Sequence, residues 1–168
     1  MDLAIYLALL VLLSVIVYSF GRPFFRGAPF APTDRKTMNR MLELAQVKPG
    51  ERACDIGSGD GRIVIALAKA GAYADGFEIN PLLVWWSKLR IKSLGLSDKA
   101  HIYRKSLWKT DFSPYDVVTL FGIPYIMKPL GEKLYPELKP GARVASNNFK
   151  FPNWTPAHKE HGIIVYIR

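Results

Sequence analysis

The chain of 168 residues is poor in groups that disulfides and metal sites need: it has one cysteine, three histidines and only 14 acidic residues. Cys54 alone excludes a disulfide framework within the chain, and because it lies in a mostly apolar run we expect an inert core thiol. The histidines are scattered or near the end, with no cysteine beside them, so no metal site is expected. Against the few acids stand 23 Lys and Arg residues, and the net charge of +9 indicates an anionic partner, either a membrane surface or nucleic acid.

An uncharged apolar run occupies residues 3–20. As a helix it would be roughly 27 Å long at ~1.5 Å per residue, close to the thickness of a bilayer's hydrocarbon core. Because the basic start and the small-x-small exit of a signal peptide are missing, we expect residues 1–21 to be a retained transmembrane anchor. The alternatives are a cleaved signal peptide and a buried core helix. Basic residues follow the run and Asp2 precedes it, so the positive-inside rule predicts a single-pass membrane protein with its N-terminus outside and its catalytic domain in the cytoplasm or an organellar equivalent.

Residues 22–33 contain several prolines and read as an irregular linker, which leaves residues 34–168 as one domain. In this domain apolar runs of strand length alternate with segments of helical periodicity, so we expect an α/β fold with right-handed crossovers. Only one strand fits after Asn148, and the segment between Ser106 and Tyr115 is too short for a full helix. The prediction is a sheet trimmed to about six strands in the order 3-2-1-4-5-6, with the last strand antiparallel beside the fifth.

Glycines at alternate positions follow an acid between the first strand and the next helix: Asp55, Gly57, Gly59 and Gly61. They would permit a sharp turn, a close approach of the backbone to a ligand, and a helix that starts near the strand. A dinucleotide fingerprint needs its third glycine at position 62, which is Arg62. The spacing instead resembles motif I of the class I S-adenosylmethionine (SAM) methyltransferases, where the acid suits a cationic methionine moiety. The alternative is a glycine-rich turn that binds nothing.

Other cofactor contacts are expected at the ends of the next two strands. Glu78 ends the second strand, 23 residues after Asp55, and its carboxylate can accept hydrogen bonds from both ribose hydroxyls of an NAD or a SAM molecule. After the third strand, Ser106 could hydrogen-bond the adenine edge, and Leu107 and Trp108 could pack near the ring. A plain core position is the alternative for Trp108.

The methyl acceptor is expected beside the fourth strand. The apolar run 115–121 reads as a strand buried on both faces, and open α/β sheets place their sites at the carboxyl ends of such strands. The loop that follows, residues 122–125, is therefore the candidate wall of an aromatic and carbonyl-lined channel. We predict that this channel is formed by Phe121, Pro124, Tyr125 and Trp154.

With these segments in view, the chain resembles the small membrane-anchored protein-lysine methyltransferases of the class I (seven-β-strand) group, whose mitochondrial members modify the adenine nucleotide translocase and the ATP synthase c-subunit. The resemblance extends over nearly the whole chain, through the N-terminal span and residues 28–33, 55–64, 76–81, 103–109, 141–144 and 151–154. It implies SAM as cofactor, in-line attack by a neutral lysine amine on the SAM methyl group, and a protein substrate, expected to be membrane-embedded. Ser106 departs from the pattern, since the family tends to have Asp there.

The resemblance and the motifs together give the full set of cofactor-binding candidates. Within it Pro32 and Thr33 are expected, by resemblance, to close over the methionine end. The set comprises Pro32, Thr33, Asp55, Gly57, Ser58, Gly59, Gly61, Glu78, Ile79, Asn80, Ser106, Leu107 and Trp108.

Three other functions stay open at this point. The charge also fits a nucleic-acid amino methyltransferase, and the loop Gly122-Ile123-Pro124-Tyr125 is similar to the Pro-Pro-Tyr loop of such enzymes, although the first proline is absent. A lipid or small-molecule methyltransferase and a non-catalytic SAM-binding membrane protein are the other two.

Overall fold

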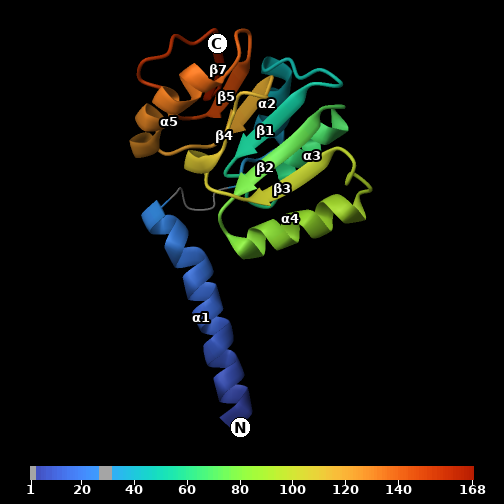
Figure 1. Cartoon of the computed structure of the whole chain (residues 1–168), viewed down its shortest axis with the longest axis vertical. Helices are drawn as coiled ribbons and strands as arrows, with labels where there is room; N and C mark the ends of the chain where they lie inside the picture. The colour runs from blue at the N-terminus through green and yellow to red at the C-terminus, as the bar shows by residue number, and fades with distance from the viewer. Residues whose placement is uncertain (1–2, 27–31) are drawn as a thin grey trace.

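A seven-stranded mixed sheet forms the centre of the computed structural model, which describes residues 3–26 and 32–168, with the backbone alone for 15–26 (Figure 1). Its strands are β1 (Arg52–Ile56), β2 (Tyr73–Glu78), β3 (Ala100–Arg104), β4 (Val117–Leu120), β5 (Arg143–Asn147), β6 (His158–Glu160) and β7 (Ile163–Ile167). Their order is β3-β2-β1-β4-β5-β7-β6. The first five strands are parallel, and β7 runs antiparallel to both β5 and β6.

The predicted count of six strands is wrong. The order of the first five and the antiparallel strand beside β5 are as predicted, but β6 adds a seventh strand through a tight hairpin with β7. The hairpin turns at His161 and Gly162, both with positive φ as the tight two-residue hairpin turns require. Because β6 has only three residues, all polar, it shows no apolar alternation by which it could be recognised in the sequence.

Four helices cover the two faces of the sheet, and they are α2 (Arg35–Leu44), α3 (Arg62–Lys69), α4 (Pro81–Ser93) and α5 (Pro124–Glu137), with a 3₁₀ turn η1 (Leu107–Lys109). The first helix, α1 (Leu3–Arg26), extends away from the sheet (Figure 1). One core joins α2, α3 and α4 to one face of the sheet through residues such as Met41, Val64 and Ile91. A second core joins α5 to the other face and includes the buried free thiol of Cys54, whose pKa is raised well above its usual value by burial.

The helix α1 is longer than the predicted anchor and runs to Arg26, so the first residues of the predicted linker are helical. Its described side chains, on residues 3–14, are apolar or aromatic apart from Ser14, and would cover roughly 18 Å at ~1.5 Å per residue. In the described part of the chain no helix combines the length and apolar character needed to cross a bilayer, which overturns the predicted transmembrane helix. Residues 27–31 of the linker lie outside the described residues. The domain boundaries and the localisation stay predictions.

Candidate functional site

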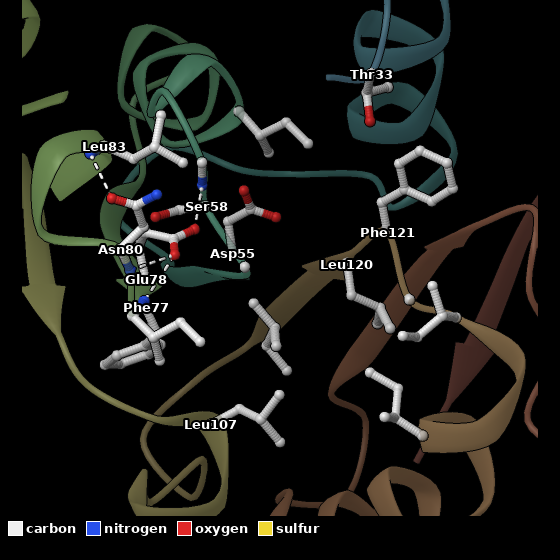
Figure 2. Close-up of a pocket in the computed structure, with 18 of the residues that line it drawn as sticks. Thr33, Asp55, Ser58, Phe77, Glu78, Asn80, Leu83, Leu107, Leu120 and Phe121 are labelled. Carbon is white, nitrogen blue, oxygen red and sulfur yellow. Dashed lines mark hydrogen bonds between the residues drawn. The ribbon is translucent and has the colours of Figure 1, made fainter. Parts of the chain in front are cut away.

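A cavity of about 470 Å³ opens where the strand order reverses between β1 and β4, at the carboxyl ends of the strands. It is lined by Pro32 and Thr33, most of 55–63, and residues from 77–83, 105–108 and 120–130, together with Phe149. Every predicted cofactor-binding residue except Gly61 lines it. Figure 2 shows the side chains of Asp55 and Glu78 close together in the cavity, with Thr33 and Phe121 across from them.

Gly61 does not line the cavity but lies at the start of α3, against α4. It is the N-cap of α3 with a φ of 76°, a left-handed conformation that glycine adopts without strain. A Cβ added there would come within 3.0 Å of the Ser87 Cβ on α4. The Ser87 hydroxyl lies within hydrogen-bond reach of the Gly59 carbonyl, at 2.8 Å, and of a carbonyl within α4. The glycine loop is therefore held against α4, and Gly61 allows the close packing that this requires.

Glu78 ties the end of β2 to the glycine loop. Its buried carboxylate accepts backbone N–H groups from Gly59 at 3.0 Å, and from Ile79 and Asn80 at 2.7 Å each (Figure 2). These three bonds fix the carboxylate, which retains acceptor capacity for ligand hydroxyls. The Asn80 side chain is used differently, since it accepts the Leu82 N–H at 3.0 Å and caps α4.

Asp55 lies at the second-last position of β1 and is also buried. Burial raises its pKa to about 7; the 2.8 Å hydrogen bond from the Thr119 hydroxyl opposes that rise, and the charges of Glu78 and Asp60 add to it. No salt bridge to Asp55 exists within the described residues. A buried carboxyl of this kind is suited to a ligand that brings its own positive charge.

Arg62, the residue that departs from the dinucleotide fingerprint, fastens the segment before α2 over the cavity. Its guanidinium donates to both carboxylate oxygens of Asp60, at 2.9 and 3.0 Å, and to the Thr33 carbonyl at 2.9 Å. Arg90 on α4 donates to Asp60 as well, at 2.7 Å. From the other side, the Asn147 amide donates to the Thr33 hydroxyl at 3.3 Å. Sequence reasoning missed this network, and the arginine in place of a third glycine was its one visible signal.

The predicted adenine segment forms the 3₁₀ turn η1. The Ser106 hydroxyl caps this turn by accepting the Trp108 N–H at 3.4 Å, so its first role is local. Leu107 points into the cavity (Figure 2), and Trp108 lines the rim with 42% of its surface exposed. Phe77, which sequence reasoning did not select, lines the same region and stacks on Tyr103.

An apolar wall follows β4. Phe121 lines the cavity as predicted, and its ring stacks on Phe149 with centroids 6.0 Å apart and planes at 20°. Pro124 begins α5 and is not among the lining residues; Tyr125 is not either, although its neighbours Ile123 and Ile126 are. Phe149 was missed because an aromatic residue in an irregular segment carries no positional signal.

The structure does not bring Trp154 to the cavity. Its ring stacks on Phe151 at 4.8 Å and meets Tyr135 and Tyr166 edge-on, at 5.3 and 5.5 Å. The cluster lies between α5 and β7, where Gly131 leaves room for the indole. Trp154 therefore packs in the second core, and the prediction that it lines the channel is wrong. Phe149 lines the wall of the cavity instead.

The residues present fit a SAM molecule. The cavity combines a fixed carboxylate for ribose hydroxyls, a buried carboxyl for an ammonium group and apolar side chains for an adenine ring. In addition, the buried Ser58 hydroxyl at the glycine loop has no hydrogen-bond partner within the described residues. Such an orphaned polar group is costly unless a ligand or water completes it.

Known methyltransferases are similar to this chain in sequence. The ANTKMT methyltransferase domain family matches residues 55–158. The rat ATP synthase c-subunit lysine N-methyltransferase is 44% identical over 150 residues, which cover 86% of this chain and 69% of the rat protein. A protein-lysine N-methyltransferase of Saccharolobus islandicus (strain REY15A) is 38% identical over 149 residues, covering 83% of this chain and 92% of that protein.

A solved structure extends the comparison to the fold and the ligand. The crystal structure of an RNA methyltransferase from Salinibacter ruber in complex with S-adenosyl-L-homocysteine superimposes with a TM-score of 0.76 at 37% identity. The match covers 82% of this chain and 92% of that one. The class I methyltransferase fold and the family resemblance predicted from the sequence are thereby confirmed. The chain belongs to the ANTKMT methyltransferase family, and it is a SAM-dependent methyltransferase.

Proposed function

We propose that this enzyme methylates the side-chain amine of a lysine in a protein substrate, and that the substrate is a membrane protein. The observation that carries the proposal is the division of the cavity into a polar half, around Asp55 and Glu78, and an apolar half, around Phe121 and Phe149. The names of the relatives, lysine N-methyltransferases acting on proteins, support it.

The polar half is suited to hold the cofactor. Glu78 would accept hydrogen bonds from the ribose hydroxyls, and Asp55 would face the ammonium group of the methionine portion. Leu107 and Ile79 would flank the adenine. When bound, SAM supplies an electrophilic methyl group on a positively charged sulfur.

The apolar half is suited to the lysine. A lysine ammonium must lose a proton before it can act as a nucleophile, which at pH 7 costs about 4.6 kcal/mol for an ordinary lysine. A wall of Phe121, Ile123 and Phe149 removes water from the amine and so lowers its pKa. No histidine or carboxylate belongs to this wall among the described lining residues, so we expect the proton to leave to solvent rather than to a side-chain base.

A labelling experiment tests the proposal. The purified full chain and tritiated SAM are added to the membrane fraction of a cell lysate and, in a separate reaction, to the soluble fraction. We expect a protease-sensitive labelled band in the membrane fraction, with acid hydrolysis yielding methylated lysine. Glu78→Ala should abolish the label, whereas Glu137→Ala, which removes another carboxylate that accepts a backbone N–H, should retain it. Label on protein in the soluble fraction only would refute a membrane protein as the substrate but would leave lysine methylation of a protein standing.

One observation favours a second candidate, an RNA methyltransferase: the Salinibacter ruber relative bears that name. The same labelling reaction distinguishes the two, because nuclease treatment would remove the label from a nucleic acid and leave it on a protein. Label extracted into organic solvent would indicate a lipid substrate. SAM binding without label in any fraction would contradict the proposed protein substrate.

A further inference from the structure

The outer face of α4 carries an apolar stripe that nothing in the described chain covers. Leu82, Trp85, Trp86 and Leu89 lie at the i, i+3, i+4 and i+7 positions of one helix face, and 38%, 60%, 50% and 42% of their surfaces are exposed. We call these four residues the α4 stripe. The opposite face of the helix packs into the core through Val84, Ser87 and Ile91, so the stripe is not needed for folding.

Positive charge borders the stripe, and negative charge is missing from the helix. The sequence of α4 contains Lys88, Arg90 and Lys92 and no acidic residue. Lys88 and Lys92 follow Trp85 by three and seven residues, so they lie along the edge of the stripe, and both are exposed. Arg90 is held by Asp60. The two lysines form no salt bridge within the described residues.

The stripe lies near the entrance to the cavity. Figure 1 shows α4 along the β3 edge of the sheet, as the outermost helix of its layer. Leu83, the neighbour of Leu82, lines the cavity. Arg104 at the end of β3 is paired in register with Glu78, two residues before the helix cap, and continues the basic edge toward the site. A surface that contacts the stripe would therefore also contact the rim of the active site.

We propose that the α4 stripe docks the enzyme onto an anionic lipid surface. Tryptophan favours the boundary between hydrocarbon and water, and leucines beside it can enter the outer acyl region. Lys88 and Lys92 would reach lipid phosphates while their methylene chains stay against the stripe. The net charge of +9 favours the same surface.

The geometry argues against the other occupants. A partner helix is usually bound in a groove between elements, whereas the stripe is a convex ridge on a single helix at the edge of the sheet. Nucleic acid would be contacted mainly by basic side chains, and the exposed leucines on both sides of the tryptophan pair would not contribute to the affinity for phosphate groups. The docking lies in the plane of the membrane surface and requires no spanning helix. It also does not depend on which molecule accepts the methyl group.

Tryptophan quenching tests the contact at the helix itself. In the full chain with Trp108→Phe and Trp154→Phe, Trp85 and Trp86 are the remaining tryptophans. Vesicles of phosphatidylcholine and phosphatidylglycerol with brominated acyl chains should quench and blue-shift their emission, and phosphatidylcholine vesicles should do so far less. Because the readout is local to α4, vesicle binding through any other segment would leave the emission unchanged, and that result would overturn the proposal.

Two pairs of variants make the test quantitative, by vesicle co-sedimentation of the full chain with all four tryptophans. Trp85→Ala/Trp86→Ala should weaken binding to the phosphatidylglycerol vesicles by about tenfold or more. Lys88→Gln/Lys92→Gln should weaken it about fivefold per lysine. The matched control, Lys48→Gln/Lys69→Gln, removes two exposed charges outside α4, near the amino-terminal ends of the central strands β1 and β2, and should have a smaller effect. If both lysine pairs weakened vesicle binding equally, net charge alone would explain the binding and the proposal would be overturned. The proposal would also be overturned if the emission of Trp85 and Trp86 changed only on addition of RNA or only on self-association of the protein.

Discussion

The two halves of the cavity are built in different ways. In the cofactor half, Glu78 is fixed by three backbone N–H groups, and the glycine loop is fixed by Asp60 and Arg62. In the acceptor half, Phe121 and Phe149 are positioned by ring stacking and apolar contacts. Hydrogen bonds hold groups to within a few tenths of an ångström, whereas apolar packing tolerates small changes of shape.

This difference matches what each half must do. A cofactor with fixed hydroxyl and ammonium positions needs polar partners at fixed points, and a lysine side chain needs chiefly a dry channel. Substitutions in one half should therefore change SAM affinity, and substitutions in the other should change methyl transfer at saturating SAM.

The largest effect is expected at Glu78. Glu78→Ala removes the acceptor of three buried N–H groups together with the proposed ribose contact, so SAM affinity should fall at least about a hundredfold, ~2.7 kcal/mol. Isothermal titration calorimetry measures the affinity, and a thermal melt verifies folding. Glu78→Gln retains a carbonyl acceptor and should lose less. A Kd within threefold of the wild-type value for the folded Ala variant would contradict the assignment of the cofactor half.

The second effect belongs to the acceptor half. Phe121→Ala opens the wall to water, so the lysine amine loses its desolvation and kcat/KM for the methyl acceptor should fall about thirtyfold. The Kd for SAM should stay within about threefold. Initial rates with tritiated SAM, together with calorimetry, measure the two quantities. If SAM affinity fell as much as kcat/KM, the division of the cavity into two halves would be refuted.

The sequence predicted what is encoded by neighbouring residues. Asp55, Gly57 and Gly59 define a turn by their spacing alone, and Glu78 is recognisable as an acid at a strand end, so the sequence selected four residues that line one cavity. Their contact with the cofactor stays a prediction. The alternation of strands and helices predicted the α/β class, and the order of β1–β5 came from the resemblance to methyltransferase sheets. These features depend on local conformation, and local conformation is where sequence patterns are most informative.

What the sequence did not show depends on contacts between distant residues. Arg62 meets Thr33 across 29 positions and Thr33 meets Asn147 across 114, and no local pattern specifies such pairs. Trp154 illustrates the same limit, since an aromatic residue suits a channel and a core equally well until the packing is known. The transmembrane helix was wrongly predicted for a different reason, because the apolar composition of residues 3–20 was taken as sufficient evidence for a bilayer-spanning helix.

The pH dependence of SAM affinity follows from Asp55, whose pKa in the free enzyme is about 7. A cationic ligand favours the ionised carboxylate, so SAM affinity should be highest well above pH 7 and should decrease as the pH falls through about 7. Between pH 8 and pH 6 we expect about a tenfold loss. Calorimetry in buffers of different ionisation enthalpy should also detect a proton released on binding near pH 6.5. The same pH profile in Asp55→Asn would assign the titration to another group.

The stability of the free enzyme should depend on Asp55 in the opposite sense. Its folded-state pKa is raised above the unfolded value of 3.8, so between pH 3.8 and about 7 the folded protein binds more protons than the unfolded chain. The contribution of this group to stability therefore decreases as the pH rises through that window. Asp55→Asn should melt at a higher temperature than wild type at pH 8 without SAM, while binding SAM more weakly.

The smallest effect sharpens the comparison at the boundary of the cofactor half, where Arg62 fastens the Thr33 carbonyl over the cavity. Arg62→Gln shortens the side chain and removes its charge, so the carbonyl is released, while Asp60 keeps its bonds from Arg90 and from the backbone N–H of residue 62. SAM affinity should fall about fivefold, mainly through faster dissociation, with kcat at saturating SAM within about twofold of wild type. Stopped-flow displacement measures the dissociation rate. Arg40→Gln is the matched control, because the Arg40 guanidinium also forms salt bridges, with Glu43 and Glu160, but lies away from the lining residues. If both variants released SAM at the wild-type rate, the segment over the cavity would hold its position without Arg62.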